Sequence, residues 1–262
     1  MDPAAPFDRQ AVRRHRDRAA REVGQVADLL GELADRLLDR LDDTTERFAT
    51  ALDLDGRGVV ATRLAARGIA TVSTDLSLPM AMRNPRPCVV ADAERLPFAP
   101  GCFDLVVASL SLHWINDLPG ALIQLRTALR PGGLLLASMP ALGTLDRLRA
   151  ALIAAESALS GGASPRISPF PELRDCAALL QRAGFELPVA DVEEVDLSYA
   201  APLALLRELR AAGEANALAE RDRRPPPRAL FPAALAALAG PDGRVAVRLR
   251  LAVLTGWAPR QR

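Results

Sequence analysis

The stretch that most constrains the fold is residues 51–66, which read ALDLDGRGVVATRLAA. Residues 51–54 are apolar apart from one acid, as in a buried strand, and residues 55–58 form a tight turn with two glycines. Residues 59–66 then place apolar side chains at helical spacing. Strand, glycine turn and helix in this order open the nucleotide-binding half of a doubly wound sheet, because glycines let the backbone approach a ligand at the helix N-terminus. The same pattern alone also fits a plain strand-to-helix connection.

Two later acids strengthen the nucleotide-binding interpretation. Residues 71–75 predict a second strand that ends in Asp75, and residues 88–92 predict a third that ends in Asp92. Asp75 follows Gly58 by 17 residues, close to the spacing of about 20 at which an acid reaches the ribose hydroxyls of a nucleotide. Each acid also has a local alternative, since Asp75 would cap a helix together with Ser77 and Asp92 would order a turn. The residues expected to bind a cofactor are Asp53, Asp55, Gly56, Gly58, Asp75, Leu76, Asp92, Ala93 and Ser109.

The strand and helix pattern continues through the middle of the chain. Residues 105–109 and 134–138 are fully apolar strands, separated by a helix at 120–129. Apolar strands that alternate with helices predict a mainly parallel sheet with right-handed crossovers and helices on both faces. Residues 185–199 predict two short strands at an antiparallel edge of the sheet, and a helix is expected at 202–220.

We therefore expect an α/β, Rossmann-like, doubly wound fold in a single domain. Helices between residues 145 and 240 are expected to roof the active cleft. The expected divisions are a helical lead-in at 1–45, a cofactor-binding core at 46–140, and roof helices with C-terminal strands at 141–262. Within the lead-in, residues 7–20 predict a charged helical arm exposed to solvent, in which His15 has no catalytic role, and residues 23–41 predict an amphipathic helix on the sheet.

Composition narrows the functional classes. The chain has 262 residues, of which 50% are hydrophobic, and a formal net charge of +1, which argues against general attraction to nucleic acid. All 33 basic residues are arginine, as in proteins of GC-rich bacteria. The three cysteines are scattered, so no metal site is expected, and no apolar run has membrane-spanning length. Because aspartates interrupt the arginine-rich start, unlike in a transit peptide, we expect a cytoplasmic protein.

Acids at the ends of the first three strands resemble the pattern of class I S-adenosylmethionine (SAM) methyltransferases. In that family the turn carries the methionine end of the cofactor, the second acid the ribose, and the third the adenine amino group. The resemblance therefore implies SAM as cofactor, the turn at 55–58 for its methionine end, Asp75 for its ribose and Asp92 for its adenine.

Three further segments resemble a narrower group: CFDLVVASLSLHWINDLP at 102–119, SPRISPF at 164–170 and GEANA at 213–217. With Phe7-Asp8-Arg9 and Thr255-Gly256-Trp257, they look like the complex I assembly factor 5 family and its alphaproteobacterial relatives. A more distant resemblance is to the malonyl-acyl-carrier-protein O-methyltransferase of biotin synthesis, which shares a Trp after strand four and a helix start like Gly143-Thr144-Leu145. The first resemblance implies hydroxylation of an arginine in a complex I subunit, and the second implies methylation of a carboxylate.

Three residues outside the cofactor motif are candidates for the chemistry. His113 and Trp114 follow the fourth strand and would roof the transferred group, with His113 as a proton acceptor near neutral pH. Arg166 would pair with a substrate carboxylate or a protein partner through bidentate contacts. The structural alternatives are a packed strand end for His113 and Trp114, and a loop anchor for Arg166.

The glycine turn departs from the family pattern. The usual Asp-Leu-Gly-x-Gly-x-Gly is shortened by one residue here, and Asp55 stands where the carboxylate of the cofactor would lie. Two functions follow. The first is a SAM-dependent methyltransferase acting on a small acid, an acyl carrier or a protein side chain. The second is an assembly factor that binds a respiratory complex I subunit and has weakened or lost catalysis.

Overall fold

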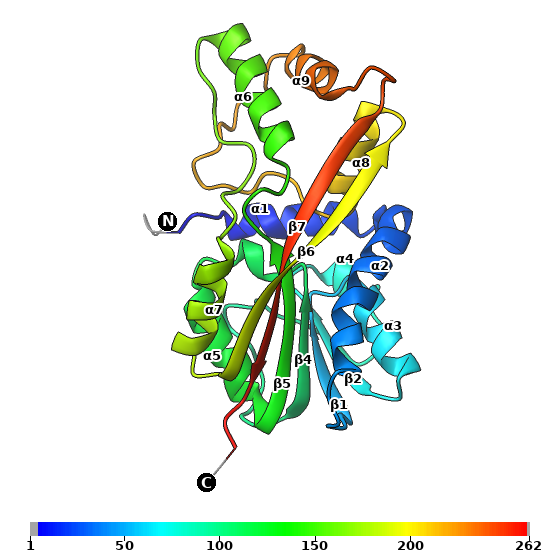
Figure 1. The fold of residues 1–262 in the computed structure, drawn as a ribbon, viewed down its shortest axis with the longest axis vertical. Helices are drawn as coiled ribbons and strands as arrows, with labels where there is room; N and C mark the ends of the chain where they lie inside the picture. Colours follow the sequence, from blue (N-terminus) through cyan, green and yellow to red (C-terminus); the bar gives the residue numbers. More distant parts are fainter. Residues whose placement is uncertain (1–4, 261–262) are drawn as a thin grey trace.

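A seven-stranded sheet with strand order β3-β2-β1-β4-β5-β7-β6 forms the centre of the protein (Figure 1). The structure is a computed structural model and describes residues 5–260. Five neighbouring strands are parallel, β7 runs antiparallel to β5, and β6 runs antiparallel to β7 at the sheet edge. The strands are β1 (Thr50–Leu54), β2 (Ala70–Asp75), β3 (Cys88–Val90), β4 (Phe103–Ser109), β5 (Leu129–Pro140), β6 (Glu186–Tyr199) and β7 (Val245–Trp257).

Helices cover both faces of this sheet, as the fully apolar strands predict. Leucines of α5 (Leu118–Ala128) and α7 (Leu173–Arg182) pack on one face, and those of α2 (Ala27–Leu38) and α3 (Val59–Ala66) pack on the other. A short helix, α4 (Leu78–Ala81), follows β2. The predicted Rossmann-like, doubly wound fold with an antiparallel C-terminal edge is therefore confirmed.

Helix α1 (Arg9–Ala19) lies across the carboxyl ends of the parallel strands (Figure 1). Asp8 caps it by accepting a hydrogen bond from the amide of Ala11 at 3.0 Å. Its apolar side packs against Leu76 and Trp114 through Ala11 and Val12. The expectation of a solvent-exposed arm is wrong, because α1 buries apolar side chains against the ends of the sheet.

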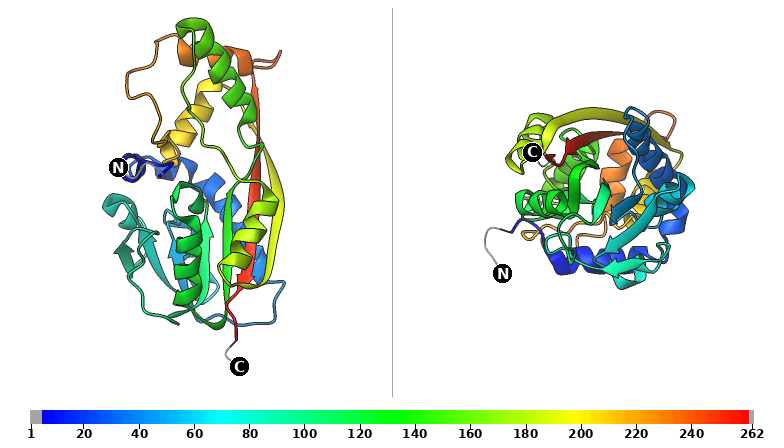
Figure 2. Two further views of the ribbon diagram at one scale, coloured as in Figure 1. Left: turned by 90° about the vertical axis from the view of Figure 1, so that its left-hand side faces the viewer. Right: turned by 90° about the horizontal axis from the view of Figure 1, so that it is seen from below.

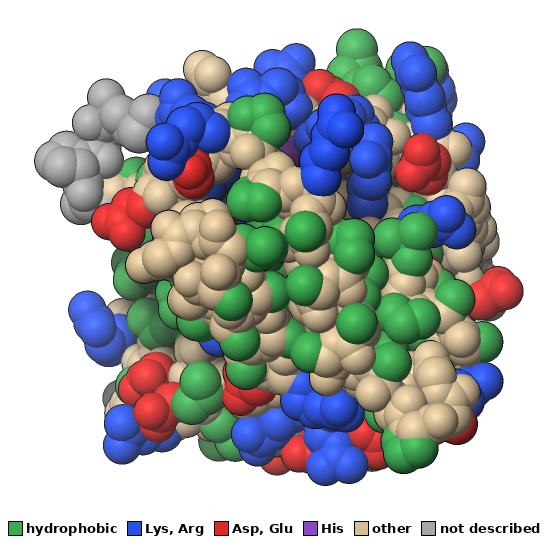
Figure 3. All heavy atoms as spheres, turned by 90° about the horizontal axis from the view of Figure 1, so that it is seen from above, with side chains coloured by type: hydrophobic (Ala, Val, Ile, Leu, Met, Phe, Trp, Pro, Cys, Tyr) green, Lys and Arg blue, Asp and Glu red, His purple; other side chains and the backbone are tan. Residues whose placement is uncertain are grey.

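The upper part of the molecule, the upper lobe, consists of α6 (Asp146–Ser160), α8 (Pro202–Ala211), α9 (Leu230–Leu238) and the far ends of β6 and β7 (Figures 1 and 2). It has a hydrophobic cluster of its own that includes Leu148, Leu205 and Leu230. Scattered hydrophobic side chains lie on the face seen from above, with arginines at its margin (Figure 3). Strands β6 and β7 run continuously from the core into the upper lobe, which favours the expected single domain. The division of the chain into domains stays a prediction.

Three predicted elements differ from the observed ones. Residues 186–199 form one strand and not two, because β7 pairs with them almost from end to end. The helix predicted at 202–220 ends at Ala211, since Gly213 takes a φ of +84° and the following residues turn toward α1. The helix predicted at 23–41 divides into α2 flanked by single 3₁₀ turns, η1 (Val23–Val26) and η2 (Asp39–Leu41). In the described part of the chain, the helices are too short or too polar to span a bilayer.

Candidate cofactor and acceptor site

The turn between β1 and α3 is tightly held. Asp55, Arg57 and Gly58 all take positive φ values, of 58°, 56° and 85°. Aspartate and glycine enter this region more readily than arginine does. The amide of Gly58 donates to Asn84 Oδ1 at 2.8 Å, and a Cβ on Gly58 would lie 2.8 Å from the carbonyl oxygen of Arg83. Only glycine fits there without a shift of the chain.

The side chain of Asp53 packs against the inner side of this turn. Its side chain is fully buried, and Ser73 Oγ donates a hydrogen bond to it at 3.3 Å. A Cβ on Gly56 would lie 2.0 Å from Asp53 Oδ1, so Gly56 leaves the space that this carboxyl group occupies. Burial raises the pKa of Asp53 to about 7. The structure thus places Asp53 and Gly56 against each other inside the turn.

Asp75 lies at the carboxyl end of β2 with one oxygen bonded and one open. The amide of Ser77 donates to Asp75 Oδ1 at 2.8 Å, and Ser77 caps α4. Asp75 Oδ2 is buried and has no hydrogen-bond partner among the described residues, although Arg16 Nη1 lies 3.5 Å away. Asp75 therefore has the local role, while its second oxygen is buried beside Arg16.

Arg16 of α1 is the cation that faces these acids. It is 2% exposed, and its Nη2 lies 3.9 Å from Asp55 Oδ2. Burial would lower the pKa of Arg16, but Asp75 and Asp55 outweigh it and raise that pKa above its usual value. Burial and the nearby Asp75 raise the pKa of Asp55 to about 7. Arg16 counteracts this rise, but burial and Asp75 outweigh the one guanidinium that both carboxyl groups share.

Asp92 is joined to α1 by a second arginine. Arg9 forms an ion pair with the Asp92 carboxylate, and Arg9 Nη1 donates to the carbonyl oxygen of Trp114 at 2.9 Å. Ala93 is 2% exposed and packs in the core, and Leu76 packs against α1. Sequence analysis missed Arg9 and Arg16, although the repeated arginines of residues 7–20 were the available signal.

Glu214, which lies in the loop after α8, connects several predicted residues. Its Oε2 accepts hydrogen bonds from His113 Nε2 at 2.8 Å and Trp114 Nε1 at 2.7 Å, and its Oε1 pairs with Arg57. Burial would raise the pKa of Glu214, but His113, Arg57 and Arg16 lower it well below its usual range. With Nε2 hydrogen-bonded to this carboxylate, His113 keeps Nδ1 buried and without a partner among the described residues.

Arg57 links the glycine turn with the residues after β4. Its Nη2 donates to the carbonyl oxygen of Leu110 at 3.0 Å and its Nε to that of Ala212 at 3.1 Å, and Nη1 approaches the carbonyl of Ser109. Burial and the nearby Arg16 lower the pKa of Arg57 to about 10. Ser109 therefore contributes its backbone at this point, and its side chain is buried.

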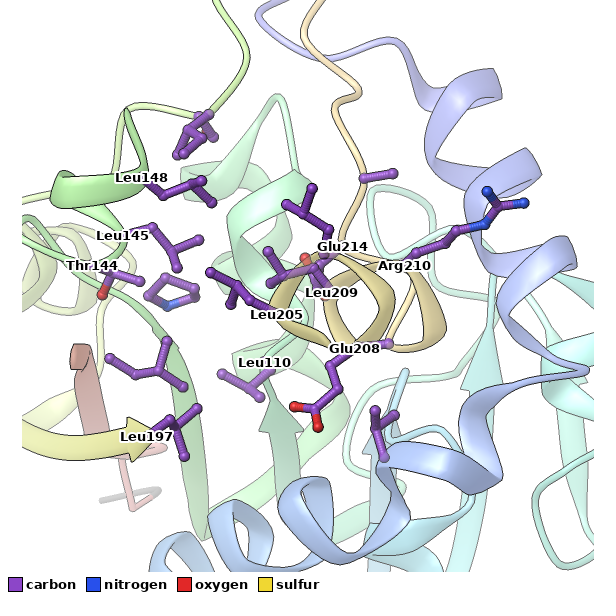
Figure 4. A pocket seen from close by; sticks show the side chains of 18 of the residues that line it. Leu110, Thr144, Leu145, Leu148, Leu197, Leu205, Glu208, Leu209, Arg210 and Glu214 are labelled. Carbon is purple, nitrogen blue, oxygen red and sulfur yellow. The ribbon is translucent and has the colours of Figure 1, made fainter. Parts of the chain in front are cut away.

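A cavity of about 450 Å³ lies between the carboxyl ends of β4 and β5 and the upper lobe (Figure 4). His113, Trp114 and Glu214 line it, as does Arg166. Arg166 is anchored by Glu156, whose Oε2 accepts from Arg166 Nε at 2.9 Å. The loop-anchor alternative for Arg166 is therefore observed, and its place on the cavity wall still allows contact with a substrate.

The residues at the strand ends fit SAM. Asp53 Oδ1, Asp55 Oδ1 and Asp75 Oδ2 are buried acceptors without hydrogen-bond partners among the described residues. The ribose hydroxyls and ammonium group of SAM are donors, so they match this set. Asp75 and Asp92 would hold the nucleoside part and the turn at 55–58 the methionine part. Within residues 5–260, no group of His, Cys, Asp and Glu has the arrangement of a metal site.

Comparisons with known proteins identify the family. Residues 52–137 match the methyltransferase domain family model. The chain is 36% identical to the mitochondrial arginine-hydroxylase NDUFAF5 of Danio rerio over 97% of this chain and 83% of that protein. It is 35% identical to the malonyl-[acyl-carrier protein] O-methyltransferase of Xylella fastidiosa over 97% of this chain and 89% of that protein. A SAM-dependent methyltransferase structure from Methanosarcina mazei shares the fold, with a TM-score of 0.51, 13% identity and coverage of 85% of this chain and 98% of that one.

The chain belongs to the class I SAM-dependent methyltransferase family. Within that family it is similar to the group that contains arginine-hydroxylase NDUFAF5, and also to the malonyl-acyl-carrier-protein O-methyltransferases. It is a SAM-dependent methyltransferase, and SAM is its cofactor.

Proposed function

We propose that Asp75 binds the ribose of SAM and that His113 accepts the proton of the methyl acceptor. The observation that carries this proposal is the pairing of His113 with Glu214 on the cavity wall, where Glu214 also pairs with Arg57 of the glycine turn. Bound SAM supplies an electrophilic methyl group for an in-line displacement, so the protein mainly positions the acceptor and excludes water.

The acceptor in this proposal carries a dissociable proton, as a hydroxyl or carboxyl group does. His113 Nδ1 is a buried acceptor on the cavity wall. The Glu214 carboxylate accepts from Nε2 at 2.8 Å, which favours the tautomer with a free Nδ1 and stabilises the charged ring that forms when Nδ1 takes the proton. Trp114 is fixed by the same carboxylate and closes the site.

The second candidate is action on an arginine of a respiratory complex I subunit, as an assembly factor. Its support is the 36% identity with arginine-hydroxylase NDUFAF5 over most of both chains. The two candidates predict different products from one assay with a peptide or protein acceptor. Mass spectrometry distinguishes an added methylene from an added oxygen, and capture of complex I subunits by the chain tests the non-catalytic form.

The cellular setting is also part of the proposal. The exclusive use of arginine among 33 basic residues is the observation that favours a bacterial origin, and with it a cytoplasmic protein. Immunodetection in fractions of the source cell tests this assignment.

Titration of SAM into the purified protein by calorimetry tests the proposed site. We expect micromolar binding that weakens at least tenfold in Asp75→Asn, because the amide removes the charge that the ribose hydroxyls meet. Asp196→Asn is the matched control, since Asp196 is an exposed carboxylate on β6 that pairs only with Arg248 at the surface. Equal affinity in all three proteins would reject the assignment of Asp75.

A further inference from the structure

The cavity above β4 and β5 is walled mostly by apolar side chains, of which leucine is the most frequent, from elements far apart in the sequence (Figure 4). Among them are Leu29 and Leu33 of α2, Leu148 of α6, Leu205 and Leu209 of α8, and Leu249 of β7. A volume of about 450 Å³ falls within the range of about 300–1,000 Å³ that small-molecule sites occupy. The cavity therefore offers a large apolar surface to a ligand.

Two of the charged side chains on this wall are paired within the protein. Among the described residues, Arg166 pairs with Glu156 and Glu214 pairs with Arg57. Glu208 Oε2 accepts from the Tyr199 hydroxyl at 2.9 Å, and Arg210 extends away from the surrounding leucines (Figure 4). A charged group placed among the leucines would lose its hydration without gaining a counter-charge, whereas an uncharged chain would bury its surface there.

His113 contributes a buried acceptor to the wall. The residue is 8% exposed, and its Nδ1 is buried and has no hydrogen-bond partner in the part of the chain that the structure describes. An unmet acceptor at the edge of an apolar cavity selects a ligand with a single hydrogen-bond donor at one end.

We infer that the cavity binds a medium-length, uncharged aliphatic chain that carries a terminal O–H group, with the chain against the leucines and the O–H at His113. This inference rests on the proposed function and names its substrate class. The aliphatic chain of the ligand supplies affinity by burying apolar surface, and its O–H group fixes the position of the ligand along the cavity.

The test measures binding of hexanol, octanol and decanol to the full-length protein without SAM, by displacement of a neutral fluorescent naphthylamine probe. We expect affinity to rise about fourfold per added methylene, which corresponds to about 0.8 kcal/mol. The decyl methyl ether lacks the donor, so we expect it to bind about threefold to tenfold more weakly than decanol.

Leu209→Trp fills the cavity and should weaken decanol binding at least tenfold. The matched control is Leu159→Trp, because Leu159 is 45% exposed on α6 and does not line the cavity. Thermal unfolding of both variants shows whether the fold is kept. If Leu209→Trp fails to fold, Leu206→Trp, at another lining residue, replaces it.

Equal binding of all three alcohols, or equal binding by Leu209→Trp and Leu159→Trp, would overturn the inference. Failure on the alcohols together with capture of an apolar peptide would instead indicate a protein acceptor. SAM calorimetry on the same preparation separates the two proposals. Normal SAM binding without alcohol binding rejects only the aliphatic ligand. Alcohol binding without SAM binding rejects only the proposed cofactor site.

Discussion

The carboxylate of Glu214 accepts a hydrogen bond from His113 Nε2 at 2.8 Å, although the two residues are 101 positions apart in the chain. The same carboxylate also binds Trp114 and the buried Arg57. It therefore fixes in one place the side chains that face the acceptor cavity and the arginine that reaches the glycine turn.

Glu214→Gln should lower the unfolding free energy by about 3 kcal/mol, because Arg57 stays buried without its anion. The methyl-transfer rate should fall about tenfold or more, with a changed pH profile, if Glu214 positions His113. Urea unfolding and a pH–rate series measure both effects. Glu194→Gln, at an exposed pair with Arg250, should change stability by less than about 0.5 kcal/mol. A loss of the same size in both variants would contradict the role of Glu214.

Arg16→Met should destabilise the protein by about 3 kcal/mol, since it leaves Asp55 and Asp75 buried without their shared cation. Chemical unfolding measures the change. Arg18→Met, on the exposed side of the same helix, is the control and should be close to neutral. Equal stability of the two variants would contradict the buried pairing of Arg16 with Asp55 and Asp75.

Asp55→Asn should stabilise the protein at high pH. The folded protein holds the Asp55 proton up to about pH 7, whereas the unfolded chain releases it near 3.8. Stability contributed by this proton is present below about pH 4 and is lost as the pH rises toward 7. This raised pKa of Asp55 sets a ceiling of about 4 kcal/mol on the effect. Because Asn also removes a partner of Arg16, we expect a gain of about 2 kcal/mol at pH 8 and little at pH 4.

Asp196→Asn serves as the control for this pH series. Its hydrogen bond from Arg248 lowers the pKa of Asp196, so its contribution is present above about pH 4 and is lost on acidification. The sign of its pH dependence should therefore be opposite to that of Asp55→Asn. Parallel curves for the two variants would refute the raised pKa of Asp55.

Gly58→Ala should cost more stability than Gly68→Ala. Both glycines have positive φ, of 85° and 77°, so the backbone penalty of about 1 kcal/mol is shared. A Cβ at Gly58 meets the Arg83 carbonyl at 2.8 Å, whereas one at Gly68 meets nothing within 4 Å. We expect a further loss of about 1–2 kcal/mol and weaker SAM binding for Gly58→Ala alone. Equal melting temperatures for Gly58→Ala and Gly68→Ala would show that the turn accommodates a Cβ at residue 58 without cost, and would contradict this prediction.

The core of the fold could be predicted from the sequence because local patterns determine it. Short strand-like runs, most of them followed by a helix, leave few arrangements other than a parallel sheet. The strand-end position of Asp75 follows from the same pattern. Residues 186–199 were harder, since pairing with β7, not local pattern, makes them one strand.

The partners of the candidate residues could not be predicted, because they come from distant segments. Nothing near His113 in the chain indicates Glu214, and nothing in α1 indicates that Arg16 meets Asp75 while Arg13 and Arg14 of the same helix stay exposed. Arg166 shows the same limit. Its sequence context suggested a substrate contact, but only the fold reveals that Glu156 holds it.

The attachment of α1 has a consequence for the order of folding. Asp8 donates its amide to the carbonyl of Ala217, and its carboxylate pairs with Arg221, which lies 213 positions later in the sequence. Contacts of such long sequence separation form slowly, because the entropy of closing the loop opposes them until both ends are ordered. Strands β1 to β5 can therefore pair before α1 docks across their carboxyl ends, and we expect the cofactor cleft to be the last part of the molecule to become ordered.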